Sequence, residues 1–343
     1  MFYVQVKDDR LLYMLKRKRK RMAVTILIVA AVLIALKFIL FPIVREIPVT
    51  GKYQITSEDY WVTLDKADPY SRNGSKRQLQ IRKWHPIECT EERPVIVASH
   101  GSCGSIDNNL SLYRELASHG YTVLAVAHPG QVASIKYENG KKSGPSRAFF
   151  KELFSLKPDG APEKAYGVYH KWMEIRTYDL NSVMDDFVAK NGSSRFIAEG
   201  HSLGGSAAYA MARIREDVIG VIALESPFMY DIKGIENEKF IFDDSDYNVP
   251  VLSIYSDAAY PYLREWDQYR NNAKFLDSAN PLYTNIHYEG IGHMGLCELS
   301  HVSPVLTAIF DNGFQKTKAA DQLKKLNEDC LAWLHSLNDA GQD

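Results

Sequence analysis

The sequence lacks most of the features that mark specialised classes of protein. It has four cysteines in 343 residues, and they do not stand at the short spacings of a zinc site. No internal repeat and no low-complexity tract is present. Neither the Gly-x-x-x-x-Gly-Lys phosphate loop nor a dinucleotide-binding fingerprint occurs. We therefore expect no metal ion and no nucleotide or other cofactor.

The sequence also has little net charge, because Lys and Arg balance Asp and Glu to within one unit. That balance hides an asymmetry: residues 1–21 hold eight Lys or Arg against Asp8 and Asp9, so the remainder is acidic. The body of the chain therefore lacks the basic surface that nucleic-acid binding requires. A composition of 45% hydrophobic and 24% charged residues suits one large globular domain with an appendage.

The appendage is an apolar run over residues 22–44, which only Lys37 and Pro42 interrupt and which a basic cluster at 16–21 precedes. At ~1.5 Å per helical residue it is long enough to cross a hydrocarbon core of ~30 Å. Positive charge stays on the cytoplasmic side. We predict a cytoplasmic segment 1–21, an uncleaved transmembrane signal-anchor 22–44 and an extracytoplasmic domain 45–343. A cleaved signal peptide and a buried core helix are the alternatives. The first would have a shorter apolar stretch followed by small residues.

The four cysteines are Cys89, Cys103, Cys297 and Cys330. An even number in an exported domain permits disulfides, with three possible connectivities. A bond between Cys103 and Cys297 would join two loops that border the site proposed below. Isolated buried thiols are the alternative, and the sequence does not choose between them.

Apolar patterning predicts an α/β fold. Two partly alternating stretches, 52–65 and 76–84, predict an antiparallel start to a sheet. Strands and helices then alternate, which predicts a mostly parallel sheet flanked by helices. The strands are expected at 94–99, 121–127, 195–199, 218–224, 250–255 and 285–288, and the helices at 109–118, 172–187, 202–213 and 316–336. Because long loops without structure are uncommon unless they serve a function, we interpret residues 129–171 as a cap or lid.

The sequence Gly200-His201-Ser202-Leu203-Gly204 fits Gly-x-Ser-x-Gly and lies where a buried strand gives way to a helix. In that context the turn is so sharp that only small neighbours fit, and it presents the Ser hydroxyl at the start of the helix. Ser202 is therefore the candidate nucleophile. The alternative is a glycine turn that merely packs the helix on the sheet.

A serine hydroxyl needs a base and an acid that orients the base. His293, in a glycine-rich loop after the last strand, has the expected position for the base. His201, His287 and His301 fit that position less well. For the acid, Glu225 and Asp257 both end strands between Ser202 and His293, and both remain candidates, with Glu225 favoured.

The oxyanion of the transition state needs about two backbone N–H donors. One is expected from Leu203, the residue after the nucleophile. The other is expected from the glycine-rich stretch at 99–104, with Ser102 as the donor.

With these residues the chain resembles the platelet-activating-factor acetylhydrolase family of serine lipases, within the α/β-hydrolase superfamily, over residues 94–299. The likeness lies in Ser99-His100-Gly101, in the run at 116–121, in the turn after 127–128, in the elbow at 200–204 and in His293. The resemblance places the acid on Glu225, where the family has Asp. It implies an ester hydrolase acting on phospholipids with short or oxidised acyl chains, and a lipid partner beside the membrane. A peptidase, thioesterase or polyester hydrolase on the same residues, or a non-catalytic binding module, are the other readings.

Overall fold

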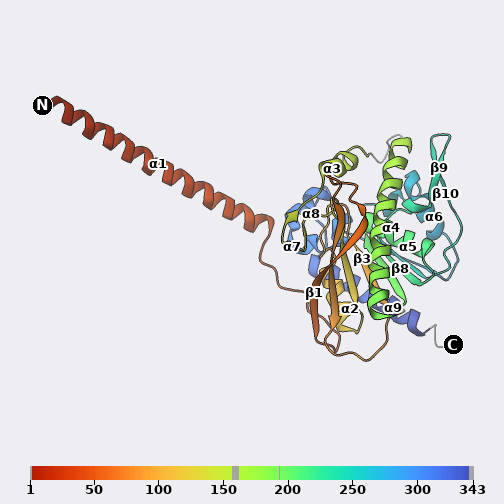
Figure 1. Ribbon diagram of the computed structural model, residues 1–343. Coiled ribbons are helices and arrows are strands. Elements are labelled where there is room, and N and C mark those ends of the chain that lie inside the picture. The colour runs from red at the N-terminus through yellow and green to blue at the C-terminus, as the bar shows by residue number, and fades with distance from the viewer. Residues whose placement is uncertain (1, 157–161, 193, 340–343) are drawn as a thin grey trace.

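The computed structural model describes residues 2–156, 162–192 and 194–339 of the chain (Figure 1). Its first element is one long helix, α1 (Phe2–Leu40), which projects away from the rest of the molecule (Figure 1). The part Leu12–Leu40 has a mean hydropathy of 2.8 over its most apolar window, and none of that window is buried. This helix is long and apolar enough to span a membrane. It runs without a break through the basic cluster at 16–21.

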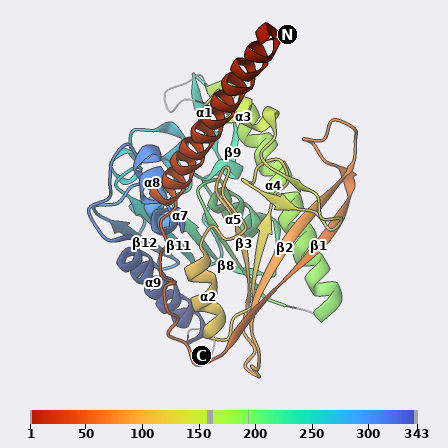
Figure 2. The same cartoon turned by 90° about the vertical axis from the view of Figure 1, so that its left-hand side faces the viewer.

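The remaining chain forms a sheet of eight strands with helices on both faces (Figure 2). The strand order is β1-β2-β4-β3-β7-β8-β11-β12. The strands are β1 (Ile55–Ala67), β2 (Lys76–Pro86), β3 (Val95–Ser99), β4 (Val123–Ala127), β7 (Phe196–His201), β8 (Val218–Leu224), β11 (Val251–Ser256) and β12 (Tyr283–Tyr288). β1 and β2 form antiparallel pairs, and all pairs from β4 to β12 are parallel. The predicted order of an antiparallel start followed by a parallel sheet is therefore confirmed.

The inner parallel strands β4, β3, β7, β8 and β11 are buried on both faces because helices cover each side. Along β3, Val95 and Val97 face one apolar cluster while Ile96 and Ala98 face the other. The helices α2 (Leu110–Ser118) and α9 (Ala319–Asp339) pack on the side of Ile96. α4 (Pro162–Asn191), α5 (Leu203–Ile214) and α6 (Arg270–Leu276) contribute to the opposite cluster. Burial on both faces explains why these strands are continuous apolar runs rather than alternating ones.

The segment 129–171 contains regular structure that the sequence analysis did not predict. It holds the short hairpin β5 (Ile135–Lys136) and β6 (Lys142–Ser143), the helix α3 (Arg147–Leu153) and the first turns of α4. α4 begins at Pro162, ten residues before the predicted start, because proline is well tolerated in the first helical turn, where its missing N–H has no partner to lose. Residues 157–161 lie outside the described part of the chain.

Further elements after β8 were also missed. β9 (Ile232–Glu236) and β10 (Lys239–Phe242) form a hairpin whose turn residues, Asn237 and Glu238, both have positive φ. The turn lacks the glycine that usually reveals such a hairpin in a sequence. Two short helices, α7 (Leu299–Val302) and α8 (Pro304–Phe310), follow β12. Single 3-10 turns occur at Met229–Asp231, Tyr260–Tyr262, Asp267–Tyr269 and His293–Leu296.

A pair of glycine substitutions tests the close packing of α5 against β3. A Cβ at Gly204 would lie 1.8 Å from the carbonyl oxygen of Ser99, whereas a Cβ at Gly167, in α4, would meet nothing within 4 Å. Gly204→Ala should lower the free energy of unfolding by about 3 kcal/mol or more, since two backbones must separate. Gly167→Ala should raise it by about 0.5–1 kcal/mol, because alanine favours the helix. Chemical denaturation measures both; equal effects would contradict this packing.

Candidate active site

Ser202 lies at the sharp turn from β7 into α5. Its φ is 55° and its ψ is −126°, a strained backbone conformation for a residue with a Cβ. The chain reverses so tightly that a Cβ at Gly200 would lie 2.3 Å from the carbonyl carbon of Gly204. The Ser202 amide donates to Leu224 O at 2.8 Å, which ties the turn to the end of β8. The Gly-x-Ser-x-Gly motif thus has the strand-turn-helix setting that the sequence predicted.

His293 and Glu225 form a direct hydrogen bond. His293 follows β12 in a 3-10 turn, and its Nδ1 lies 2.7 Å from Glu225 Oε1. Glu225 is buried at the end of β8 with a φ of 48°. Its second oxygen, Oε2, accepts from the amide and the hydroxyl of Ser256, both at 2.6 Å. The carboxylate is held on both sides, so its orientation towards the imidazole is fixed.

The pKa values of these two residues shift in opposite directions. Burial alone would raise the pKa of Glu225, but hydrogen bonds from His293 and Ser256 outweigh burial and hold that pKa below its ordinary value. Burial alone would lower the pKa of His293, but the hydrogen bond and charge of Glu225, together with the charge of Asp311, raise it above its ordinary value. The site therefore stabilises a carboxylate beside an imidazolium.

The alternative acid, Asp257, lies apart from His293. Its Oδ1 lies 2.9 Å from His287 Nε2, and its Oδ2 accepts from the amide of Gly290 at 2.7 Å. Gly290 belongs to the loop that leads to His293. Asp257 thus supports that loop, while Glu225 contacts the imidazole itself.

His201, inside the elbow, contacts His293 through its ring. The two ring centroids are 4.5 Å apart. His201 Nε2 donates to the carbonyl oxygen of His293 at 3.1 Å, since a carbonyl can only accept. Burial holds the pKa of His201 well below its ordinary value, so the ring is neutral. No role for His201 was predicted, and its place in the Ser202 motif was the only available signal.

The two expected oxyanion donors come from different elements beside Ser202. Leu203 begins α5, and Ser102 follows Gly101 in the loop after β3. A Cβ at Gly101 would lie 3.3 Å from the Cβ of Ser202, so this loop passes close to the elbow. Ser102, Leu203, Ser202, Glu225 and His293 all line one pocket.

A buried polar network, which the sequence analysis missed, holds the loop after β3. Arg176, from α4, is fully buried, and its Nη1 donates to His100 O at 2.6 Å and to Ser99 Oγ at 3.0 Å. Its Nε donates to Gln131 Oε1 at 2.6 Å. The guanidinium therefore fixes the backbone just before Gly101 and Ser102.

A second layer of this network connects Ser99 to β2. Ser99 Oγ lies 3.0 Å from His128 Nε2, and His128 Nδ1 lies 2.7 Å from Asp179 Oδ2. Asp179 also accepts two bonds from Arg77, both at 2.7 Å. Burial keeps the pKa of His128 well below its ordinary value, so its neutral ring donates to Asp179 and accepts from Ser99. Partners 29 to 102 residues apart in the chain give no local sequence signal.

The pocket above Ser202 has a volume of about 340 Å³ and a mostly apolar wall. Its outer wall comes partly from the predicted lid, through side chains of α3 and α4 and their flanking residues, and partly from the chain after β8 and β11. The apolar and aromatic lining residues are Leu153, Leu156, Tyr169, Trp172, Pro227, Met229, Trp266 and Tyr269. A pocket of this size lies at the small end of the range of about 300–1,000 Å³ found for ligand sites.

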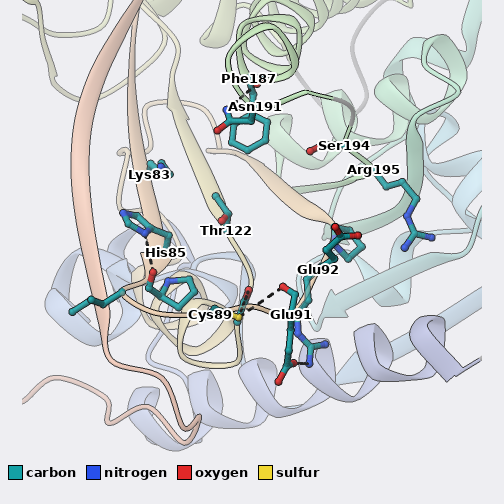
Figure 3. A pocket seen from close by; sticks show the side chains of 15 residues that line it. Lys83, His85, Cys89, Glu91, Glu92, Thr122, Phe187, Asn191, Ser194 and Arg195 are labelled. Carbon is teal, nitrogen blue, oxygen red and sulfur yellow. Dashed lines mark hydrogen bonds and ion pairs between the residues drawn. The ribbon is translucent and has the colours of Figure 1, made fainter.

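A larger depression of about 660 Å³ lies around the ends of β2 and β3, and Figure 3 shows its lining. Lys83 and His85 line one side of it and Arg195 the other (Figure 3). Several of its charges are already paired: Glu91 contacts Lys52 and Arg93. None of the predicted site residues lines it, so the pocket above Ser202 is the candidate active site.

The four cysteines are all free thiols. Cys297 Sγ donates to Met294 O at 3.4 Å, and Cys103 has a φ of 55° in the loop after β3. The possible bond between Cys103 and Cys297 is therefore not formed in this structure. Among the described residues, no group of three or more His, Cys, Asp or Glu side chains is arranged to hold a metal ion.

Comparison with known proteins identifies the fold. The family profile described as "alpha/beta hydrolase fold" matches residues 94–253. A ferulic acid esterase from Streptomyces cinnamoneus is similar in structure, with a TM-score of 0.60 at 17% identity over 85% of this chain and 92% of that one. A putative dienelactone hydrolase from Klebsiella pneumoniae has a TM-score of 0.47 at 17% identity, over 82% and 99% of the two chains. No curated protein sequence matches the chain.

The chain thus has the α/β-hydrolase fold, and the predicted fold class is confirmed. The narrower resemblance to platelet-activating-factor acetylhydrolases stays a prediction.

Substitution of the two candidate acids tests the geometry through the pH dependence of activity. Since His293 must be neutral to accept a proton, and its pKa is raised, kcat/KM should increase with pH through a pKa above the ordinary ~6.5. Glu225→Gln should move this increase in kcat/KM to lower pH. It should also reduce kcat by up to about 10⁴-fold, because the charge that orients His293 is lost.

Asp257→Asn is the matched control. It should not change the pH at which kcat/KM increases, because Asp257 contacts His287 rather than His293. The measurement is kcat/KM for a soluble nitrophenyl ester between pH 5 and 9. A large loss with Asp257→Asn beside a small one with Glu225→Gln would reverse the assignment.

Proposed function

We propose that the protein is a serine hydrolase that cleaves carboxylic esters through an acyl-Ser202 intermediate. The observation that supports this most directly is the combination of a strained Ser202 at the strand-helix turn with the His293–Glu225 hydrogen bond of 2.7 Å. Ser202, His293 and Glu225 also line one apolar pocket. A nucleophile, a base with an orienting acid, and a place for the substrate are the parts that acyl transfer needs.

In the proposed mechanism Ser202 Oγ attacks the ester carbonyl and gives its proton to His293 Nε2. Glu225, through Nδ1, stabilises the imidazolium that forms. The amides of Leu203 and Ser102 donate to the oxyanion. The imidazolium then protonates the leaving alkoxide, and the alcohol departs. His293 next takes a proton from water as the water oxygen attacks the acyl-enzyme. When the second tetrahedral intermediate collapses, the bond from the acyl carbon to Ser202 Oγ breaks, the imidazolium returns its proton to Ser202 Oγ, and the carboxylic acid leaves.

The apolar wall of the pocket favours an ester with a small apolar acyl group. A lipid or short-acyl phospholipid ester, as the resemblance to platelet-activating-factor acetylhydrolases implies, would suit both this wall and a membrane location. A peptidase, thioesterase or polyester hydrolase could use the same residues. A non-catalytic binding module is disfavoured, because such a module would not need the fixed Glu225 carboxylate beside His293.

The proposed setting is a single-pass membrane protein with an extracytoplasmic catalytic domain. α1 supplies the span, and the basic residues before Met22 favour a cytoplasmic N-terminus. A cleaved signal sequence is the alternative. Retention of residues 1–44 in the mature, membrane-bound protein, measured by intact mass, would support the anchor.

Covalent labelling tests the nucleophile. The detergent-solubilised full chain should react with a fluorophosphonate probe, because such a probe phosphonylates a serine, with loss of fluoride, when a neighbouring base activates the hydroxyl. Ser202→Ala should abolish labelling and reduce ester turnover by roughly three orders of magnitude or more. Ser57→Ala, at an exposed position in β1, is the control and should label like the unaltered protein. Labelling that survives Ser202→Ala would contradict the proposal.

A series of esters tests the substrate class. With a pocket of about 340 Å³, kcat/KM should be highest for short acyl chains and fall as the chain outgrows the cavity. Leu153→Ala, at the α3 side of the pocket, should shift the optimum to longer chains by removing part of the wall. Leu337→Ala, a partly buried leucine that packs against the cluster containing α9, should not. An optimum at long chains in the unaltered protein would exclude a short-acyl esterase.

A further inference from the structure

We infer that the segment 304–314, which comprises α8 and the turn after it, lies on the surface of the bilayer that α1 spans. The inference rests on the membrane anchor proposed above. It assigns the outer leaflet, rather than another protein, as the partner of this segment.

The segment exposes three large apolar side chains. Ile309 is 64% exposed, Phe310 62% and Phe314 75%. No charged residue occurs between Pro304 and Phe310. Water-exposed aromatic and aliphatic side chains this close together mark an interaction surface. An apolar helical face of this kind can lie in the plane of a membrane interface.

The position of α8 relative to α1 identifies lipid as that partner. The hydroxyl of Ser303, the residue before α8, donates to the carbonyl oxygen of Leu40, the last residue of α1. α1 and α8 also pack against each other. From Met22, which follows the basic cluster, to Leu40 the helix rises about 27 Å, close to the ~30 Å of a hydrocarbon core. Leu40 therefore lies at the outer boundary of the bilayer, and α8 begins there.

The chain between α1 and the domain keeps α8 at this boundary. His301 Nε2 donates to Arg45 O at 2.8 Å, a second tether beside that of Ser303. Phe41 and Ile43, between these tethers, are also exposed apolar side chains. Exposed apolar side chains thus occur both in the chain that follows α1 and on α8.

This surface reaches the candidate active site through one residue. Asp311, directly after α8, accepts from the amide of Met294 at 3.0 and 3.1 Å, and Met294 follows His293. The bilayer contact would therefore lie beside the loop that carries the candidate base, so the site would lie near the lipid surface.

Thiol accessibility in vesicles tests the contact without any use of activity. The full chain with Ile309→Cys and Ile241→Cys together is reconstituted in phosphatidylcholine vesicles and treated with a charged, membrane-impermeant maleimide. Ile241 is 43% exposed on β10, which lies on the far side of the domain from α1 (Figure 1). Peptide masses separate the two sites from the native cysteines. Because both sites are in one chain, their ratio does not depend on the orientation of the protein in the vesicle.

The more exposed position, 309, should react at least about tenfold more slowly than position 241, because the interface excludes the charged reagent. Equal rates in urea would confirm that the two thiols are equally reactive. Equal rates in folded protein that stays in the vesicles after carbonate extraction would overturn the inference. The proposed membrane anchor would still hold, because the protein remains in the membrane. If position 309 is protected from the maleimide at high protein density but not at one chain per vesicle, a second copy of the chain covers the surface. That result would also overturn the inference. Loss of fluorophosphonate labelling in Ser202→Ala bears only on the proposed function.

Discussion

The geometry of the candidate site depends on one constraint, the left-handed turn at Ser202 between β7 and α5. Backbone hydrogen bonds connect this turn to the loops that follow β8 and β11. The amide of Ser202 donates to Leu224 O, the amide of Glu225 donates to Ile254 O, and the amide of Asp257 donates to Ile291 O. Each loop at the carboxyl edge is thus tied to the next strand. The register of the parallel strands therefore determines the relative positions of the turn, the acid and the loop that carries His293. Contacts among their side chains alone do not determine them.

Near the same edge of the sheet, the buried carboxylates of Glu225 and Asp179 are both paired. A buried ion costs several kcal/mol unless a partner and hydrogen bonds satisfy it. Glu225 has His293 and Ser256, and Asp179 has Arg77 and His128. These pairs do more than offset desolvation, because each fixes a loop: Glu225 orients the imidazole, and the network from Asp179 to Arg176 holds the backbone before Ser102. Stability and precise placement therefore depend on the same contacts.

The sequence predicted those parts of the fold and site that local patterns determine. Continuous apolar strands and the small residues around Ser202 are local, and the mostly parallel sheet and the elbow followed from them. The choice between Glu225 and Asp257 was not local, since both end strands at the same edge and only the path of the loop after β12 separates them. Arg176 could not have been found, because its partners His100 and Gln131 lie 76 and 45 residues away. The β9–β10 hairpin was missed because Asn237 and Glu238 adopt positive φ without a glycine.

The link between α1 and the domain also constrains how the site could meet its substrate. A flexible linker would let the domain turn freely about its anchor. Here, instead, Ile47 is buried, the amide of Thr50 donates to Glu115 at 2.9 Å and the amide of Gly51 donates to Ser118 at 3.0 Å. These contacts fasten the linker along α2, on the domain's own surface. With α1 as an anchor, the orientation of the domain relative to the bilayer is then fixed by the fold, and a lipid ester would approach Ser202 from one direction only.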